Sequence, residues 1–166
     1  MACKRLGLCC ASAKCLMPSV KRRGGHLMRI SCHLSFDGQC EVAFRTYQRL
    51  LGGEIKTMLE YGESPMADQV PPQWQNRILH ATLRLGDQEL LGTDAFPDAY
   101  ERPQGFFVTL GISELAKARE VFASLAEGGR VHMPFQETFW SAGYGVLVDR
   151  FGVPWEVNCE QPANST

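Results

Sequence analysis

Two histidines and one glutamate are the residues of this 166-residue sequence whose types and positions could do chemistry. Each lies in a stretch of alternating apolar and polar residues that predicts a β-strand, and each falls on the more polar face: His33, His80 and Glu156. Imidazole and carboxylate groups that converge from three strands would suit a divalent metal or general acid–base catalysis. Each of the three alone is more typical of a solvated residue on a half-exposed sheet, so only the group as a whole favours a site.

Polar and aromatic side chains extend this predicted face. Thr82 follows His80 at the same alternation, and Phe107 and Thr109 share one face of a later strand. Trp140 and Tyr144 are either core residues or part of a pocket wall, and core is the usual place for each ring, as it is for Phe139. We expect six residues to line a ligand pocket, with Glu156 and His80 in the catalytic roles: His33, Thr82, Phe107, Thr109, Trp140 and Tyr144.

The assignment of faces depends most on one predicted hairpin near the end of the chain. Two β-prone runs, 145–148 and 153–157, are joined by Asp149-Arg150-Phe151-Gly152, a connector with turn-forming residues at both ends. Alternation in the second run puts Trp155 on one face and Glu156 on the other. A carboxylate in mid-strand, opposite a buried tryptophan, indicates that its face lines a cleft.

Hydrophobic periodicity places these residues on two copies of one βαβββ unit. The first unit has strands at 30–36, 54–61, 77–85 and 88–93, a helix at 40–51 and a polar loop at 62–76. The second has strands at 105–112 and 130–136, the hairpin, and a helix at 114–127 that Ser113 caps. Tyr47 corresponds to Phe122, 122 − 47 = 75 residues later, and a Gly-Gly pair ends each helix.

The repeat predicts an α+β fold in which each helix covers the more apolar face of its sheet. In the third strand that face should carry Leu79, Ala81, Leu83 and Leu85. The opposite faces would then curve around a cleft. We expect one domain over 29–160, with a first module at 29–94, a second at 105–159 and a tail at 161–166.

Charge and apolar content exclude several classes of protein. Residues 1–28 hold six basic and no acidic side chains, so the rest holds 11 basic and 18 acidic side chains, a net charge of −7. A domain this acidic is a poor nucleic-acid binder, and no apolar run approaches the roughly 20 residues of a membrane span. The basic leader at 1–28 is a targeting segment, a disordered tail, or sequence upstream of a true start at Met28.

Motif content narrows the chemistry further. The seven cysteines form no Cys-x-x-Cys pair, and an odd number without a clear secretory signal indicates free thiols and a cytoplasmic location. The sequence has no glycine-rich dinucleotide loop after a strand, no Walker loop and no Gly-x-Ser-x-Gly elbow. The Gly-Gly pairs at 52–53 and 128–129 are therefore interpreted as helix ends.

These motifs resemble the PhnB-like branch of the vicinal oxygen chelate superfamily, which includes glyoxalase I, fosfomycin-resistance proteins, bleomycin-binding proteins and extradiol dioxygenases. The most specific matches are Gln136-Glu137-Thr138-Phe139-Trp140 and Asp149-Arg150-Phe151-Gly152-Val153-Pro154-Trp155. Three further stretches match. They are residues 34–40 together with Ala43, Phe44 and Tyr47; residues 51–54; and His80-Ala81 together with Gly86-Asp87. The resemblance covers about residues 29–160.

The resemblance implies cup-shaped mixed sheets and a homodimer, but no particular activity. Glu156 falls on the position of the final glutamate ligand of glyoxalase-like members, whereas Phe107 stands where the second module of those members has a ligand histidine. The first-strand ligand position falls on or near Ser31 or Cys32, with His33 adjacent. PhnB-like proteins are often labelled demethylubiquinone methyltransferases, yet this sequence has no glycine loop to hold S-adenosylmethionine.

Three functions remain open at this point. The leading hypothesis is a small-molecule-binding protein that binds metal weakly or not at all. The second is a lyase or isomerase of glyoxalase type that uses a divalent metal (Zn, Ni, Mn or Fe) on Glu156, His33 and His80. The third is a dimeric scaffold whose cleft is packed shut by Phe107, Trp140 and Tyr144. None of the three involves nucleic acid or a membrane.

Overall fold

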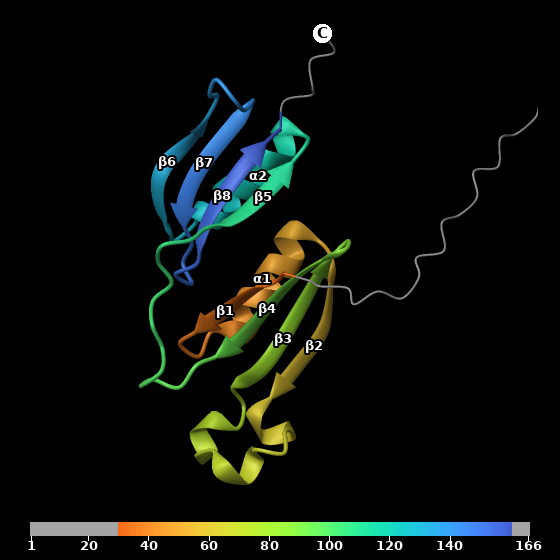
Figure 1. The fold of residues 1–166 in the computed structure, drawn as a ribbon, viewed down its shortest axis with the longest axis vertical. Coiled ribbons are helices and arrows are strands. Elements are labelled where there is room, and N and C mark those ends of the chain that lie inside the picture. Colours follow the sequence, from red (N-terminus) through yellow and green to blue (C-terminus); the bar gives the residue numbers. More distant parts are fainter. Residues whose placement is uncertain (1–29, 161–166) are drawn as a thin grey trace, which may run out of the picture.

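The structure, a computed structural model, describes residues 30–160, which form two modules of one helix and four strands each (Figure 1). The first module is β1 (Cys32–Phe36), α1 (Cys40–Leu51), β2 (Glu54–Glu60), β3 (Ile78–Leu85) and β4 (Gln88–Asp94). The second is β5 (Val108–Ile112), α2 (Leu115–Ala126), β6 (Arg130–Gln136), β7 (Gly143–Val148) and β8 (Pro154–Cys159). The predicted α+β repeat is confirmed, while the leader at 1–28 and the tail at 161–166 lie outside the described residues.

The two sheets have the same topology. Their strand orders are β1-β4-β3-β2 and β5-β8-β7-β6, and in each the first pair is parallel while the others are antiparallel. In Figure 1 each helix lies behind its own sheet, so one face of every sheet is covered and the other is open. We call the uncovered sides the first and second open faces.

Both helices bury one apolar stripe at helical spacing. In α1 the buried residues are Cys40, Ala43, Phe44 and Tyr47, and in α2 they are Ala118, Val121, Phe122 and Leu125. Gly52 has φ = 79°, a left-handed conformation that suits glycine and ends α1. The prediction that Ser113 caps α2 is wrong, because Glu114 is still extended and occupies the cap position without a side-chain hydrogen bond.

Glycines let the helix rings approach the sheets closely. A Cβ atom on Gly92 of β4 would lie 2.4 Å from the Phe44 ring, and one on Gly145 of β7 would lie 2.5 Å from the Phe122 ring. Carbon atoms do not approach to such distances, so only glycine fits at either position. Each module therefore uses a glycine to seat one helical phenylalanine on its sheet.

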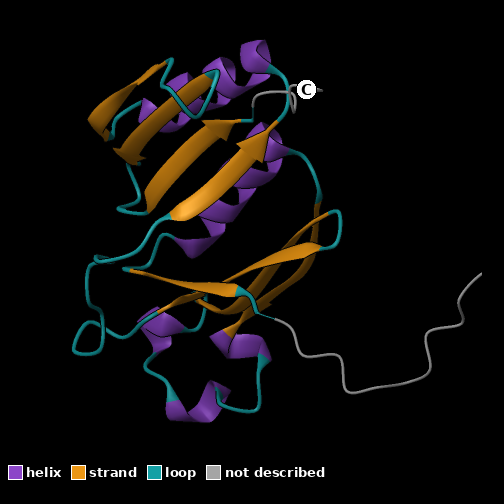
Figure 2. Cartoon of the chain, turned by 45° about the horizontal axis from the view of Figure 1, so that its top comes forward, coloured by secondary structure: helices purple, strands orange, loops and turns teal. Residues whose placement is uncertain are grey.

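A buried carboxylate joins the two modules. Asp149 Oδ2 accepts hydrogen bonds from the Tyr47 hydroxyl (2.6 Å) and from Trp155 Nε1 (2.9 Å), and its Oδ1 accepts from the backbone N–H groups of Phe151 and Val153. Burial, followed by the Asp149 charge, raises the pKa of Tyr47 well above its usual value, so the hydroxyl remains a donor. Figure 2 shows α1 on the side of the first sheet that faces the second module.

The predicted polar loop between β2 and β3 is more ordered than its composition indicates. It contains three single turns of 3-10 helix, at Tyr61–Glu63, Ala67–Gln69 and Pro72–Trp74. Trp74 packs against Phe96, with ring centroids 4.5 Å apart, so this loop is anchored to the segment that follows β4. No helix within residues 30–160 is long and apolar enough to cross a membrane.

Candidate functional site on the second sheet

Glu156 lies on the second open face, as alternation predicts. Trp155 points the other way and has no exposed surface, whereas Glu156 is half-buried. The parallel pairing of β5 with β8 places Thr109 opposite Glu156, and Thr109 Oγ1 donates a hydrogen bond of 3.0 Å to Glu156 Oε2. The polar side chains of two neighbouring strands thus meet on the side of the sheet away from α2.

Tyr144 and two further aromatic residues extend this group. Partial burial raises the pKa of Tyr144, and so does hydrogen bonding of its hydroxyl to Glu156. The Tyr144 ring lies 5.6 Å from that of Trp140, which lies 4.5 Å from that of Phe139, measured between centroids. We call Thr109, Phe139, Trp140, Tyr144 and Glu156 the aromatic–carboxylate cluster.

The rings at the end of this cluster face solvent. Phe139 is 93% exposed and Trp140 is 50% exposed, so of the two alternatives, core or pocket wall, the core is wrong for both rings. They belong to the connection between β6 and β7. Phe107, just before β5, is also 47% exposed. The second open face therefore presents large apolar surface beside a carboxylate.

The two histidines lie on the first open face. His33 of β1 and His80 of β3 reach across β4, and their rings meet edge to face with centroids 6.2 Å apart. Thr82 Oγ1 and His80 Nε2 share a hydrogen bond of 3.1 Å. Burial, and then the positive charge of His80, lower the pKa of His33, which favours its neutral imidazole.

The histidine pair and Glu156 thus belong to different sheets. Among residues 30–160, no three His, Cys, Asp or Glu side chains are arranged to hold a metal ion. His33, His80 and Glu156 therefore do not form the three-ligand group inferred from their strand faces within one copy of the chain. A metal site built from these three residues would need a second copy.

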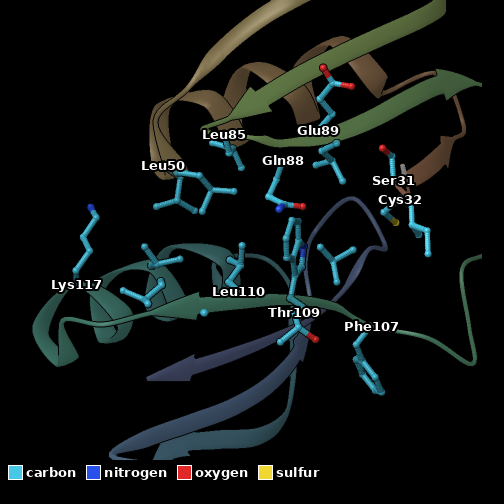
Figure 3. A pocket seen from close by; sticks show the side chains of 18 residues that line it. Ser31, Cys32, Leu50, Leu85, Gln88, Glu89, Phe107, Thr109, Leu110 and Lys117 are labelled. Atoms are coloured by element: carbon cyan, nitrogen blue, oxygen red, sulfur yellow. The ribbon is translucent and has the colours of Figure 1, made fainter. Parts of the chain in front are cut away.

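A separate cavity of about 600 Å³ opens between the two modules (Figure 3). Its walls are mostly apolar, with Leu50 and Leu85 on the side of the first module and Leu110 and Trp155 on the side of the second. Of the predicted pocket residues, only Phe107 and Thr109 border it, while His33, Thr82, Trp140 and Tyr144 do not. Sequence reasoning missed this cavity because Leu50 and Leu85 lie at apolar positions that also predict a closed core.

Two of the three cysteines that the structure describes lie in surroundings that disfavour a thiolate. Cys32, Cys40 and Cys159 are free, and Cys40 and Cys159 are buried as small apolar side chains usually are. Burial raises the pKa of Cys32 and, together with the nearby Asp94 charge, that of Cys40. Both shifts disfavour the reactive thiolate.

One family of proteins matches most of the chain. The sequence model of a family described as 3-demethylubiquinone-9 3-methyltransferase matches residues 28–158. Protein YjdN of Escherichia coli (strain K12) is 35% identical over 139 residues, which cover 79% of this chain and 95% of that protein.

Solved structures agree with this match. Protein PA1353 from Pseudomonas aeruginosa is 42% identical with a TM-score of 0.75, and the alignment covers 82% of this chain and 100% of that one. A PhnB protein from Bacillus cereus, named a putative 3-demethylubiquinone-9 3-methyltransferase, is 25% identical with a TM-score of 0.68 and coverages of 80% and 99%. A glyoxalase-related enzyme from Fulvimarina pelagi shares the fold at 13% identity, with a TM-score of 0.54 and coverages of 81% and 89%. The chain therefore belongs to the PhnB-like branch of the vicinal oxygen chelate superfamily.

Proposed function

We propose that this PhnB-like protein binds a small organic molecule on its second open face. The observation that carries the proposal is the aromatic–carboxylate cluster, in which Glu156 accepts a hydrogen bond from Thr109 and interacts with the Tyr144 hydroxyl beside the ring of Trp140. A few oriented polar groups among apolar and aromatic side chains are typical of small-molecule sites. The polar groups would orient the ligand, and the rings would supply most of the buried area.

A second copy of the chain would complete the cleft in a homodimer. In the second module Phe106 and Phe107, just before β5, and Phe139 and Trp140, before β7, are between 40% and 93% exposed, and large exposed apolar groups mark interaction surfaces. If the first open face of one copy covered the second open face of another copy, the histidine pair of the first copy would approach Glu156 of the second. His80, bonded to Thr82, and Glu156 would then be the acid–base candidates for any reaction of the bound molecule.

A metal-dependent lyase or isomerase is the second candidate function. It is favoured by the edge-to-face contact of His33 and His80, together with the lowered pKa of His33, because a neutral imidazole is the metal-binding form. The residues of a single protomer do not fit a metal, since the third ligand, Glu156, lies on the other sheet. Metal analysis of protein purified without chelator, with Glu156→Gln as the comparison, separates this function from the first.

Methyl transfer is not our proposal, although the matching family is described by that activity. The Gly-Gly pairs at 52–53 and 128–129 follow helices in the structure, as interpreted from the sequence. They connect α1 to β2 and α2 to β6, so neither pair has the strand-to-helix position of a glycine loop that binds a nucleotide.

The test is a fragment screen by saturation-transfer NMR on the full chain, with molecular mass measured by light scattering. We expect fragments to bind a dimer, and binding to be lost in Trp140→Ala. The control Val42→Ala removes a side chain of similar exposure, 59%, from α1 and should keep binding. Fragments that bind the wild type and Trp140→Ala equally, or a screen without any binder, would refute the proposal.

A further inference from the structure

We infer that the aromatic–carboxylate cluster selects an organic cation, such as a methylated ammonium group. This inference rests on the proposed function, because it names the class of ligand that the second open face binds. Three features of the described chain carry it: the charge on Glu156 without a basic partner, the inclination of the neighbouring rings, and the acidic balance of the domain.

The first feature is the unpaired charge. Within residues 30–160, no Lys, Arg or His side chain forms an ion pair with Glu156, whose partners are the neutral hydroxyl groups of Thr109 and Tyr144. Neutral hydroxyl groups leave the charge of a carboxylate uncompensated. A half-buried carboxylate of this kind gains most from a cation, since its partial desolvation strengthens the attraction.

The second feature is the geometry of the rings. The planes of Phe139 and Trp140 are inclined by 82°, and those of Trp140 and Tyr144 by 69°. These are edge-to-face contacts, so the rings turn their faces in different directions, and an exposed aromatic face attracts cations. In the part of the chain that the structure describes, arginines cover other rings, Phe135 and Phe151, and none covers these three.

The third feature is the surrounding charge. The sequence after residue 28 has 11 basic and 18 acidic side chains, a net charge of −7, which attracts cations to the domain at a distance. The cluster offers an inorganic metal ion one carboxylate, and within the described chain no group of three His, Cys, Asp or Glu side chains could hold such an ion. A bulky organic cation instead matches a single carboxylate surrounded by ring faces.

The test uses three probes of similar shape and different charge: choline, the neutral 3,3-dimethylbutan-1-ol and the anionic 3,3-dimethylbutanoate. Each is titrated into the full chain while the indole N–H signal of Trp140 is followed by NMR. Trp155, buried with its Nε1 bonded to Asp149, is the internal reference. We expect choline to bind about tenfold more tightly than the alcohol, and the anion to leave the Trp140 signal unchanged.

Two charge-removing variants locate the source of this preference. Glu156→Gln keeps the shape of the side chain and should bring choline and the alcohol to similar affinities. Glu127→Gln removes an equal charge from an exposed residue at the end of α2 and should leave the preference unchanged. An equal loss in both variants would attribute the preference to diffuse charge and would overturn the inference.

The remaining outcomes separate this inference from the function beneath it. If the alcohol binds as tightly as choline, or if fragments shift Trp140 while none of the three probes does, the cation inference fails and the proposed function stands. If neither the probes nor any fragment shifts Trp140, both fail together.

Discussion

The two open faces occupy equivalent places in the repeat but carry different side chains. In the parallel strand pair of the first sheet His33 lies opposite Leu91, and at the matching position of the second sheet Thr109 lies opposite Glu156. The first face offers a pair of imidazoles, and the second offers a carboxylate beside exposed rings. The two modules therefore share a sheet with one helix-covered face, while their open faces carry different chemical groups.

A second contrast separates the open faces from the junction between the modules. At the junction the carboxylate of Asp149 is buried and accepts four hydrogen bonds, whereas on the open face Glu156 accepts one hydrogen bond within residues 30–160, from Thr109, and interacts with the Tyr144 hydroxyl. We therefore expect stability to depend on the junction and binding to depend on the second open face. Four predictions test this division.

The largest effect is expected for Asp149→Ala. The substitution leaves the Tyr47 hydroxyl, the Trp155 indole and two backbone N–H groups without their acceptor, and should lower the free energy of unfolding by about 3–5 kcal/mol. Tyr47→Phe removes one of these donors and should cost about 1–2 kcal/mol. Urea denaturation measures both, and a loss below about 1 kcal/mol for Asp149→Ala would show that the junction does not hold the modules together.

An intermediate effect is expected when a methyl group is added to opposite faces of the second sheet. In Gly145→Ala the new Cβ would meet the Phe122 ring at 2.5 Å, which should cost about 1–3 kcal/mol of stability. In Gly111→Ala the nearest atom would be a Glu160 oxygen at 3.5 Å, so stability should change by less than about 0.5 kcal/mol. Equal losses in thermal unfolding would mean that the second open face is as tightly packed as the helix side.

A smaller difference is expected between the threonines of the two faces. Thr82 is buried and bonded to His80, so Thr82→Val should cost about 1–2 kcal/mol. Thr109 is exposed, and Thr109→Val should cost less than about 1 kcal/mol because water can replace its bond to Glu156. Chemical denaturation measures the free energy of unfolding of both variants. A larger loss in Thr109→Val than in Thr82→Val would contradict the comparison.

The smallest effect is the pH dependence contributed by His33. Its pKa is lowered in the folded chain, so the unfolded chain binds more protons below the usual histidine value of about 6.5. The stabilisation is therefore present above that pH and is lost as the pH falls through the lowered value. His33→Asn should be less sensitive than the wild type to a change from pH 7 to pH 5, and a steeper loss in the variant would contradict this sign.

The fold could be predicted because each module repeats simple periodicities. Alternation placed Trp155 inside and Glu156 outside, and helical spacing placed Tyr47 and Phe122 in the core, as the structure confirms. The exception is the start of β3, where Ile78 is buried and Leu79 is only half-buried. A register shift between Leu59 and Glu60 of β2 interrupts the alternation there, and periodicity alone does not reveal such a shift.

The candidate site was less predictable because it depends on how the sheets are arranged. Strand faces can be predicted from alternation, but the sequence does not tell whether two faces meet within one copy of the chain. The predicted group of His33, His80 and Glu156 is therefore divided between two sheets in the structure. The rings of Phe139 and Trp140 resemble core residues by type alone. The structure shows that both are exposed in the connection between β6 and β7.

The central claim is tested most directly by the indole N–H signals of Trp140 and Trp155 when a fragment from the screen binds the wild-type protein. Trp140 belongs to the aromatic–carboxylate cluster, and Trp155 borders the cavity between the modules. Our account predicts that the Trp140 signal shifts with ligand concentration while the Trp155 signal stays unchanged. A shift of Trp155 with Trp140 unchanged would place the ligand in the cavity between the modules and would contradict the account.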